Sequence, residues 1–406
     1  MPEWFSNPEF WKYVSIPVVA GVVGWFTNLV AIKLLFYPVE PFGKPPYLGW
    51  QGILPSKAAK MGAITADTTL SKLGTLRDVY QTMDPDRITE HLMATIEPKV
   101  EAYVEWVMLE ENPRLWKTTP DLIKRQVFRS VRQELPGAIE RMMAKIGDSI
   151  EEMVDIKDVV VNQLIKEKKI VNKIFLECGR VEFDFIIKSG FYFGVFFGLI
   201  QMVFWYFLPA WWVLPLFGIL VGYLTNWIAI RIIFQPLNPR KIGPFTVQGL
   251  FLKRQKAVAE IWCGIVAREI ITLSNIIEEM LYGRLSENTH GVIRHYIRKV
   301  IDRATGITRP MIEFSVGVEE YRHIKDLATE KAVTFTAYSF SDPEFTEDRA
   351  RLVQAVMQDR MEALSSEEFQ HLLRPAFQED ELKLILLGAV LGLLAGLAQL
   401  FFVFGG

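Results

Sequence analysis

The sequence has little cysteine and little net charge. Cys178 and Cys263 are the only cysteines in 406 residues, and two cysteines cannot form the disulfide framework of a small secreted fold. The formal net charge is -2 and the isoelectric point is near 6.3, which excludes a strongly basic nucleic-acid-binding protein. The sequence also contains no glycine-rich phosphate loop, Cys-x-x-Cys pair or nucleophile elbow. We therefore predict a protein that is not an enzyme, needs no cofactor and binds no nucleic acid.

Hydrophobic residues, by contrast, are abundant. They make up 50% of the chain, although 23% of the residues are charged. This mixture is typical of membrane spans joined to charged, water-facing segments. A bilayer-spanning helix needs about 20 apolar residues, and four runs are long enough. We predict transmembrane helices at residues 14–37, 189–208, 213–235 and 382–404.

One apolar stretch occurs twice in the chain. Residues 24–38 read GWFTNLVAIKLLFYP, and residues 222–236 read GYLTNWIAIRIIFQP, 198 positions later. The same spacing relates residues 194–201 (GVFFGLIQ) to residues 392–399 (GLLAGLAQ). Internal repeats of this kind define the architecture of a chain. We predict that a unit of span, helical domain and span is present twice, in parallel orientation.

The segments between the spans differ in character. Residues 38–188 and 236–381 are charged, carry apolar residues at helical spacing and have few strand signals. Residues 209–212 leave room only for a hairpin between two spans, and residues 1–13 have the aromatic composition of a membrane interface. The predicted fold class is therefore an all-α integral membrane protein with two helical domains.

Lysine and arginine are scarce on one side of the predicted spans. Residues 209–212 contain neither, and residues 1–13 contain only Lys12. The opposite ends of the spans are rich in both, and such segments face the cytoplasm in multi-pass proteins. We expect both helical domains in the cytoplasm and both termini outside. The two halves would then be related by an axis along the membrane normal.

Polar side chains lie inside the predicted spans, where unpaired polar groups are costly. They are Thr27, Asn28, Gln201, Thr225, Asn226 and Gln399. Glycines that share these helices would let the helices approach closely, namely Gly24, Gly194, Gly198, Gly222, Gly392 and Gly396. Two interpretations remain open. The amides either hydrogen-bond across these glycine seams, or they line a permeation path or a lipid-headgroup site between the repeats.

Lys33 and Arg231 lie near the predicted cytoplasmic ends of their spans. Long basic side chains at that depth reach back to the lipid head groups, so headgroup contact is the expected role. A phosphate-coordinating pair is the sharper alternative.

Three Glu-x-x-His motifs supply the candidate metal ligands of this sequence, because di-iron helical bundles combine two such motifs with two further glutamates. The motifs are Glu287/His290, Glu320/His323 and Glu368/His371. All three lie in the second half, in a region rich in glutamate, and the first half has no counterpart. We therefore expect solvated helix faces and no metal site.

The repeated Gly-x-x-Thr-Asn-x-x-Ala-Ile-(Lys/Arg)-x-x-Phe-x-Pro motif, the Gln-Gly-(Ile/Leu) after it and residues 377–392 carry a family resemblance. The chain resembles the YheB-like bacterial membrane proteins, catalogued as domain-of-unknown-function family 445. Leu252 departs from the pattern, because a proline is usual there and the first repeat has Pro55. The resemblance implies a multi-pass protein of the bacterial plasma (inner) membrane with no assigned reaction.

Two functional hypotheses follow. The first is a membrane-anchored, non-enzymatic helical assembly that contacts lipids or envelope partners. The second is a transporter or channel in which a homo-oligomer forms a path lined by Asn28, Asn226, Gln201 and Gln399.

Overall fold

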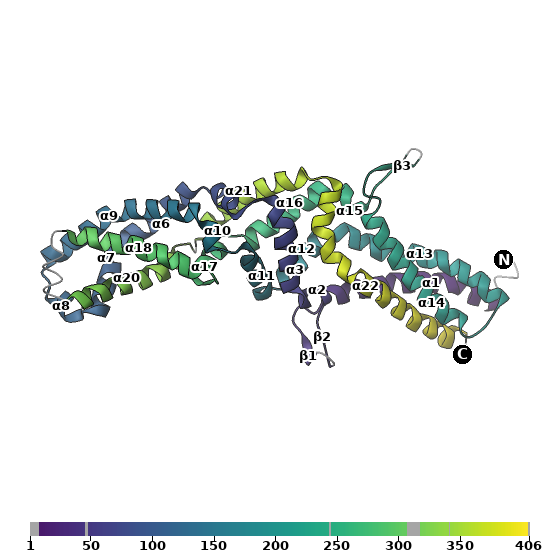
Figure 1. The fold of residues 1–406 in the computed structure, drawn as a ribbon. Coiled ribbons are helices and arrows are strands. Elements are labelled where there is room, and N and C mark those ends of the chain that lie inside the picture. Colours follow the sequence, from purple (N-terminus) through teal and green to yellow (C-terminus); the bar gives the residue numbers. More distant parts are fainter. Residues whose placement is uncertain (1–7, 45–47, 243–244, 307–316, 341, 405–406) are drawn as a thin grey trace. The chain divides into compact units, whose positions relative to one another are not determined.

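The computed structural model describes residues 8–44, 48–242, 245–306, 317–340 and 342–404, and helices dominate these residues (Figure 1). Four helices are long and apolar enough to cross a membrane: Phe10–Phe36, Arg180–Phe207, Val213–Phe234 and Glu381–Phe402. The prediction of a helical chain with four candidate spans is confirmed. The predicted tail at residues 1–13 falls largely outside the described residues.

The elements follow one another along the chain as a long series of helices interrupted by two β-hairpins. The first half contains α1 (Pro8–Phe36), β1 (Phe42–Lys44), β2 (Leu48–Trp50), α2 (Ile53–Ser56), α3 (Ala58–Ile64), η2 (Thr65–Leu70), α4 (Ser71–Leu73), α5 (Leu76–Thr82), α6 (Pro85–Ile96), η3 (Glu97–Lys99), α7 (Val100–Glu111), α8 (Pro113–Thr118), α9 (Asp121–Asp148), α10 (Ile150–Met153), α11 (Ile156–Lys166), α12 (Lys169–Cys178) and α13 (Arg180–Phe207). The second half contains α14 (Val213–Phe234), β3 (Arg240–Ile242), β4 (Phe245–Val247), α15 (Leu250–Lys253), α16 (Gln255–Ile265), η4 (Val266–Ile270), α17 (Leu273–Tyr282), α18 (Ser286–Thr305), α20 (Val318–Ser339), α21 (Pro343–Glu362) and α22 (Ser366–Val403).

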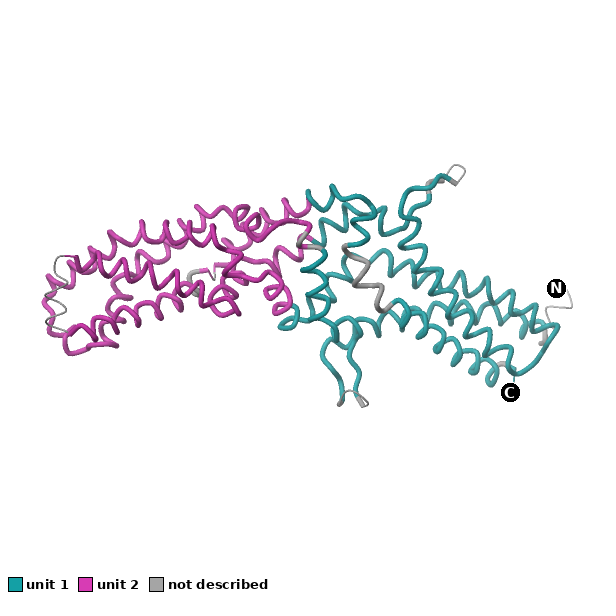
Figure 2. Tube along the Cα trace, viewed as in Figure 1, with its two compact units in different colours: residues 1–69, 164–262, 359–406 teal, residues 70–163, 263–358 magenta. Residues whose placement is uncertain are grey.

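The chain forms two compact units, and each sequence half contributes to both (Figure 2). Unit 1 comprises residues 1–69, 164–262 and 359–406, and unit 2 comprises residues 70–163 and 263–358. The two helical domains predicted at 38–188 and 236–381 are therefore not the compact units of the structure. The physical reason lies in packing, because α9 from the first half lies against α18 from the second half.

Unit 1 contains the four candidate spans, arranged as two closely packed pairs. Helix α1 packs along α13, and α14 packs along α22. The pairs also touch, through α13 with α14 and α1 with α22. Helix α22 runs without interruption from its first turn at Ser366 into the fourth span, and Ser365 and Glu368 form a capping box at its start.

Two β-hairpins project from unit 1, one after α1 and one after α14 (Figure 1). In each, a glutamine amide binds a carbonyl oxygen just past the span: Gln51 Nε2 donates to Val39 at 2.7 Å, and Gln248 Nε2 donates to Leu237 at 3.1 Å. The glycine that follows crosses the end of the span, and a Cβ at Gly52 would lie 2.6 Å from the carbonyl carbon of Phe36. This contact explains the repeated Gln-Gly motif. The sequence patterns did not predict these strands.

Unit 2 is built from helices with matching start signals. Thr75 caps α5 by accepting a hydrogen bond from the Asp78 backbone nitrogen, and Thr272 caps α17 by accepting one from Asn275. The longest helix of the unit, α9, presents an apolar stripe to the interior, including Leu135, Ile139 and Met142.

Candidate functional site: the polar core of the spans

Asn28 and Asn226 are buried at equivalent places in the two span pairs. Asn28 is 1% exposed, and its Nδ2 donates a 2.8 Å hydrogen bond to the carbonyl oxygen of Ile186 on α13. Asn226 is 4% exposed, and its Nδ2 donates a 2.9 Å bond to Leu384 on α22. An amide that faces hydrocarbon would lose its partners, and here the backbone of the neighbouring helix accepts from each Nδ2, whereas neither buried Oδ1 has a hydrogen-bond partner among the described residues.

Glycines allow each asparagine amide to reach its carbonyl acceptor on the neighbouring helix. A Cβ at Gly190 would lie 2.5 Å from Asn28 Nδ2, and Gly388 occupies the same position beneath Asn226. Gly24 faces the backbone of Gly190 in the same way, so neither helix has a side chain at the point of closest approach. The glycines named from the sequence all lie at such contacts: Gly24, Gly194 and Gly198 between α1 and α13, and Gly222, Gly392 and Gly396 between α14 and α22.

The threonine hydroxyls stay within their own helices. Thr27 Oγ1 donates to the carbonyl oxygen of Gly24 at 3.2 Å, and Thr225 Oγ1 donates to that of Val221 at 2.8 Å. Both residues are buried. A buried hydroxyl that is satisfied by its own helix adds no bond between helices.

Gln201 and Gln399 lie apart from the asparagines, beside a cavity of about 30 Å³. Residues of all four spans line it, including Thr27 on α1 and Gly222 on α14, whereas Asn28 and Asn226 are not among the lining residues. Gln399 Nε2 has no hydrogen-bond partner among the described residues. A cavity of this size has room for water, since one molecule needs at least roughly 10–15 Å³. The structure thus places the asparagine amides between paired helices and the glutamine amides beside the small cavity.

Lys33 and Arg231 do not belong to the polar core. Both side chains are exposed, and the Arg231 guanidinium lies 5.1 Å from the centroid of the Trp227 ring. Tryptophan and arginine both favour the level of the lipid head groups.

The three Glu-x-x-His motifs do not combine into a metal centre. His323 lies on α20 in unit 2 and His371 lies on α22 in unit 1, and both side chains are exposed. Within the part of the chain that the structure describes, no three His, Cys, Asp or Glu side chains come together as metal ligands. A di-iron bundle needs its motifs to project into one interior, and the described positions of His323 and His371 do not have that arrangement.

The remaining members of these motifs are exposed or engage in unrelated contacts. His290 Nε2 lies 2.9 Å from the carbonyl oxygen of Leu281, and Glu320 accepts a 3.2 Å bond from Asn112. Glu368 caps α22, and Glu287 is exposed in the first turn of α18. These glutamates and His290 therefore lie at helix ends and on helix surfaces.

Comparison with known proteins likewise indicates a membrane protein. A UPF0754 membrane protein of Trichodesmium erythraeum is 26% identical over 133 residues, which cover 32% of this chain and 30% of the relative. One of Nostoc punctiforme is 24% identical over 151 residues (36% and 35%), and one of Synechococcus elongatus is 32% identical over 128 residues (30% and 28%). No family model and no solved structure matches. This chain is a membrane protein. It is similar to an uncharacterised family, and the similarity spans about a third of the length of these relatives.

Two further polar contacts were not predicted from the sequence. Asn172 Nδ2 donates to the carbonyl oxygen of Phe36 at 2.6 Å, and Gln370 Nε2 donates to that of Phe234 at 3.4 Å. Each amide binds a carbonyl in the last turn of a span, where helical partners are missing. Asn172 and Gln370 are 198 positions apart, so a search for polar residues at the repeat spacing would have found them.

A buried ion pair joins the two sequence halves inside unit 1. Arg254 Nη1 lies 2.7 Å and 3.0 Å from the two carboxylate oxygens of Glu182, whose side chain is 3% exposed. Glu182 begins α13, and Arg254 follows α15. The sequence does not predict this pair, because a separation of 72 residues carries no periodic signal.

Proposed function

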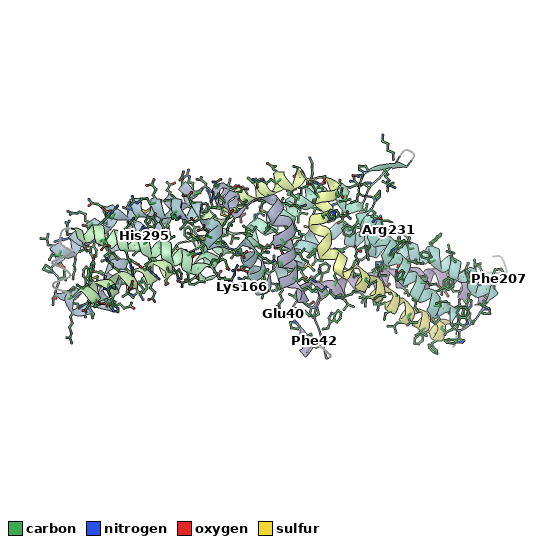
Figure 3. All side chains as sticks on the ribbon, in the orientation of Figure 1. Glu40, Phe42, Lys166, Phe207, Arg231 and His295 are labelled. Atoms are coloured by element: carbon green, nitrogen blue, oxygen red, sulfur yellow. The ribbon has the colours of Figure 1, made fainter. Side chains whose placement is uncertain are left out.

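We propose that this chain is a non-enzymatic, membrane-anchored helical assembly that contacts membrane lipids. The proposal is carried by the two projecting hairpins. Phe42 on β1 projects from the hairpin (Figure 3) and is 78% exposed. Trp50, its partner across the hairpin, is 42% exposed. On the other hairpin Arg240 and Lys241 are exposed and have no ion-pair partner among the described residues. Aromatic and basic side chains next to the ends of spans suit anionic head groups.

We infer further that the two halves are a tandem duplication. The matching hydrogen bonds support this, because the bonds of Asn28 and Asn226 link residues 158 positions apart in both halves. The caps that Asn172 and Gln370 place on the spans are likewise both 136 positions from their acceptors. Membership of the YheB-like family rests on the repeated motifs alone.

The proposed location is the bacterial plasma membrane, with both termini outside and the helical segments between the spans in the cytoplasm. This sidedness rests on the distribution of lysine and arginine near the spans. A hairpin on the cytoplasmic side would meet the leaflet that carries most anionic lipid.

Spin labelling tests the hairpin contact. A nitroxide on Phe42→Cys in nanodiscs containing phosphatidylglycerol should show the oxygen and nickel accessibility of the headgroup region. Gln133→Cys, an exposed position on α9, is the control and should report water. Equal nickel accessibility at the two sites would contradict the proposal.

The basic side chains provide an independent measurement. Arg240→Glu and Lys241→Glu should each weaken retention of phosphatidylglycerol about fivefold in native mass spectrometry, since each cation near a membrane contributes roughly 1 kcal/mol. Retention that is unchanged in the double variant would exclude headgroup binding by this hairpin.

A transporter or channel is the second candidate. The observation that favours it is the small cavity lined by all four spans, with Gln201 and Gln399 beside it. Against it, Asn28 and Asn226 are engaged between helices and do not face this cavity. Solute flux into proteoliposomes that Gln399→Leu abolishes and Asn28→Leu preserves would favour a conduit over the lipid-contacting assembly.

A further inference from the structure

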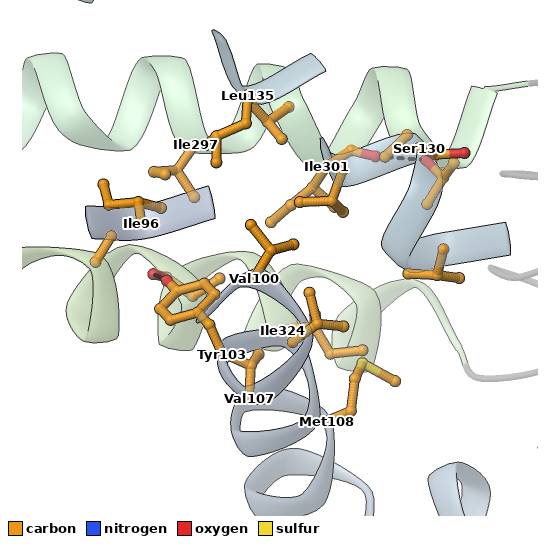
Figure 4. Close-up of a pocket in the computed structure, with 18 of the residues that line it drawn as sticks. Ile96, Val100, Tyr103, Val107, Met108, Ser130, Leu135, Ile297, Ile301 and Ile324 are labelled. Atoms are coloured by element: carbon orange, nitrogen blue, oxygen red, sulfur yellow. Dashed lines mark hydrogen bonds between the residues drawn. The ribbon is translucent and has the colours of Figure 1, made fainter. Parts of the chain in front are cut away.

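Unit 2 encloses a second cavity, of about 800 Å³, among α6, α7, α8, α9, α18 and α20 (Figure 4). Its walls are mainly aliphatic and include Val100, Val107, Ile297, Ile301 and Ile324. Sites for small molecules occupy roughly 300–1,000 Å³ and are lined by apolar side chains with a few polar groups. The cavity has the size and chemistry of a ligand site.

The cavity is elongated along the helices. On α20 the lining residues extend from Tyr321 to Thr336, which at 1.5 Å per residue is about 22 Å. On α9 they extend from Leu122 to Met142, about 30 Å by the same rise. A long and narrow apolar space suits a linear chain better than a compact solute.

The lining has few polar side chains, among them Lys99, whose Nζ lies 5.3 Å from the centroid of the Phe335 ring. The Tyr103 hydroxyl donates to the carbonyl oxygen of Ala328, and the Tyr321 hydroxyl contacts Asp302 and Thr305. Burial raises the pKa of the Tyr103 phenol, so this group stays neutral at physiological pH. A sugar or nucleotide would leave many of its own polar groups unpaired in such a space.

One end of the cavity is open and basic. The lining residues Leu122 and Ile123 are 74% and 52% exposed. The segment 113–133 contributes Leu122 and Ile123 to the lining. Its basic residues are Arg114, Lys117, Lys124, Arg125, Arg129 and Arg132, of which Arg132 pairs with Glu101 at 3.1 Å, and its single acidic residue is Asp121. Trp116 also lines the cavity, and its Nε1 has no hydrogen-bond partner among the described residues although the side chain is buried.

We propose that this cavity binds one long acyl chain whose anionic head group lies at the open end. A methylene group is similar in size to a water molecule, which occupies roughly 30 Å³, so the 800 Å³ have room for about 25 such groups. Lys124 does not itself line the cavity, but its Nζ lies 5.3 Å from the ring centroid of Trp116, which does, so Lys124 is the cation that we assign to the head group. This site goes beyond the hairpin contact, and its test is independent of the hairpins.

Photocrosslinking tests the proposal on the full-length protein in nanodiscs of zwitterionic lipid. The probe is a palmitate analogue with a diazirine at the end of its chain, and mass spectrometry maps the labelled residues. Labels should appear on α9, α18 and α20 at cavity-lining positions and should disappear with excess palmitate. Labels confined to the candidate spans would overturn the proposal.

A cavity-filling variant sharpens the test. Ala332→Trp places an indole in the cavity and should lower the labelling of unit 2 about tenfold. Gln133→Trp is the matched control, because Gln133 lies on α9, is exposed and does not line the cavity. Should Ala332→Trp fail to fold, Val131→Trp replaces it. Equal labelling in a folded filling variant and in the control would contradict the proposal.

The head group is tested by competition. Palmitate should protect the cavity from labelling at least about tenfold better than hexadecanol, since the segment that contributes Leu122 and Ile123 to the lining is rich in lysine and arginine. Weaker protection by palmitate in Lys124→Glu would support the assignment further. Equal protection by the acid and the alcohol would overturn the anionic specificity.

Discussion

Asn28 on α1 and Ile186 on α13 are joined by an amide-to-carbonyl hydrogen bond of 2.8 Å. Asn226 and Leu384 repeat this bond at 2.9 Å in the second pair of spans. Each bond ties two helices at a point where glycines bring the backbones together. A polar residue in a span therefore acts here as a contact between helices.

Replacing these asparagines should weaken the span pairs. Asn28→Leu and Asn226→Leu should each lower stability by roughly 0.6–2 kcal/mol, the range for hydrogen bonds between membrane helices. The loss should appear as a lower midpoint of thermal unfolding in detergent. Thr27→Val is the control, because the Thr27 hydroxyl is bonded within its own helix. A control as damaging as Asn28→Leu would contradict the assigned role.

Substitution of the packing glycines should be more damaging. A Cβ at Gly198 would lie 2.6 Å from the Cα of Pro17, and one at Gly396 would lie 2.5 Å from the carbonyl oxygen of Leu214. Backbone atoms cannot rotate away, so Gly198→Leu and Gly396→Leu should destabilise the protein by at least roughly 1–3 kcal/mol.

Gly291 on α18 is the matched control for this glycine series. No atom of the described chain lies within 4 Å of a Cβ built there. Gly291→Ala should therefore stabilise its helix by roughly 0.5–1 kcal/mol, as alanine does in an exposed helix interior. Unchanged unfolding midpoints for both leucine variants would refute close packing through Gly198 and Gly396.

Removing one partner of the ion pair between Arg254 and Glu182 should destabilise the protein more than breaking a surface pair. Arg254→Met leaves a buried carboxylate without its cation, which destabilises proteins by roughly 3–5 kcal/mol. Arg87→Met breaks an exposed pair with Glu90, whose side chains are 64% and 70% exposed, and should change stability by less than about 1 kcal/mol. Chemical unfolding of both variants measures the difference, and adding Glu182→Met to Arg254→Met should recover much of the loss.

Membrane sidedness can be measured with an impermeant maleimide. Trp211→Cys, in the exposed link between α13 and α14, should react in intact cells, whereas Gln133→Cys should react only after permeabilisation. The opposite pattern would reverse the proposed topology, with the helical segments outside and the link inside.

The natural cysteines should not react with the maleimide in that measurement. Burial, with a smaller contribution from Glu177, raises the pKa of the Cys178 thiol from 9.0 to about 12, and Cys263 is fully buried. The thiolate is the reactive form, so native protein should not be labelled at pH 7–8. The unfolded thiol ionises first, so stability should fall as the pH rises from about 9 towards about 12. Rapid labelling of the native wild-type protein at pH 8 would contradict this burial.

Local composition determined much of this protein. The run predicted as a span at residues 213–235 corresponds to α14, Val213–Phe234, because exclusion from water and helix formation both depend on neighbouring residues. Helical periodicity likewise put Gly24 and Asn28 on one face, and both residues contact α13.

Only the tertiary structure decided which surfaces meet. The acceptor for Asn28 is a backbone carbonyl 158 residues away. Every residue type has this carbonyl, so the identity of Ile186 does not mark it as the partner. The Glu182–Arg254 pair and the hairpins after α1 and α14 depend in the same way on contacts between distant segments. The large cavity of unit 2 has walls from both halves of the chain, and an empty space between helices exists only once they have packed.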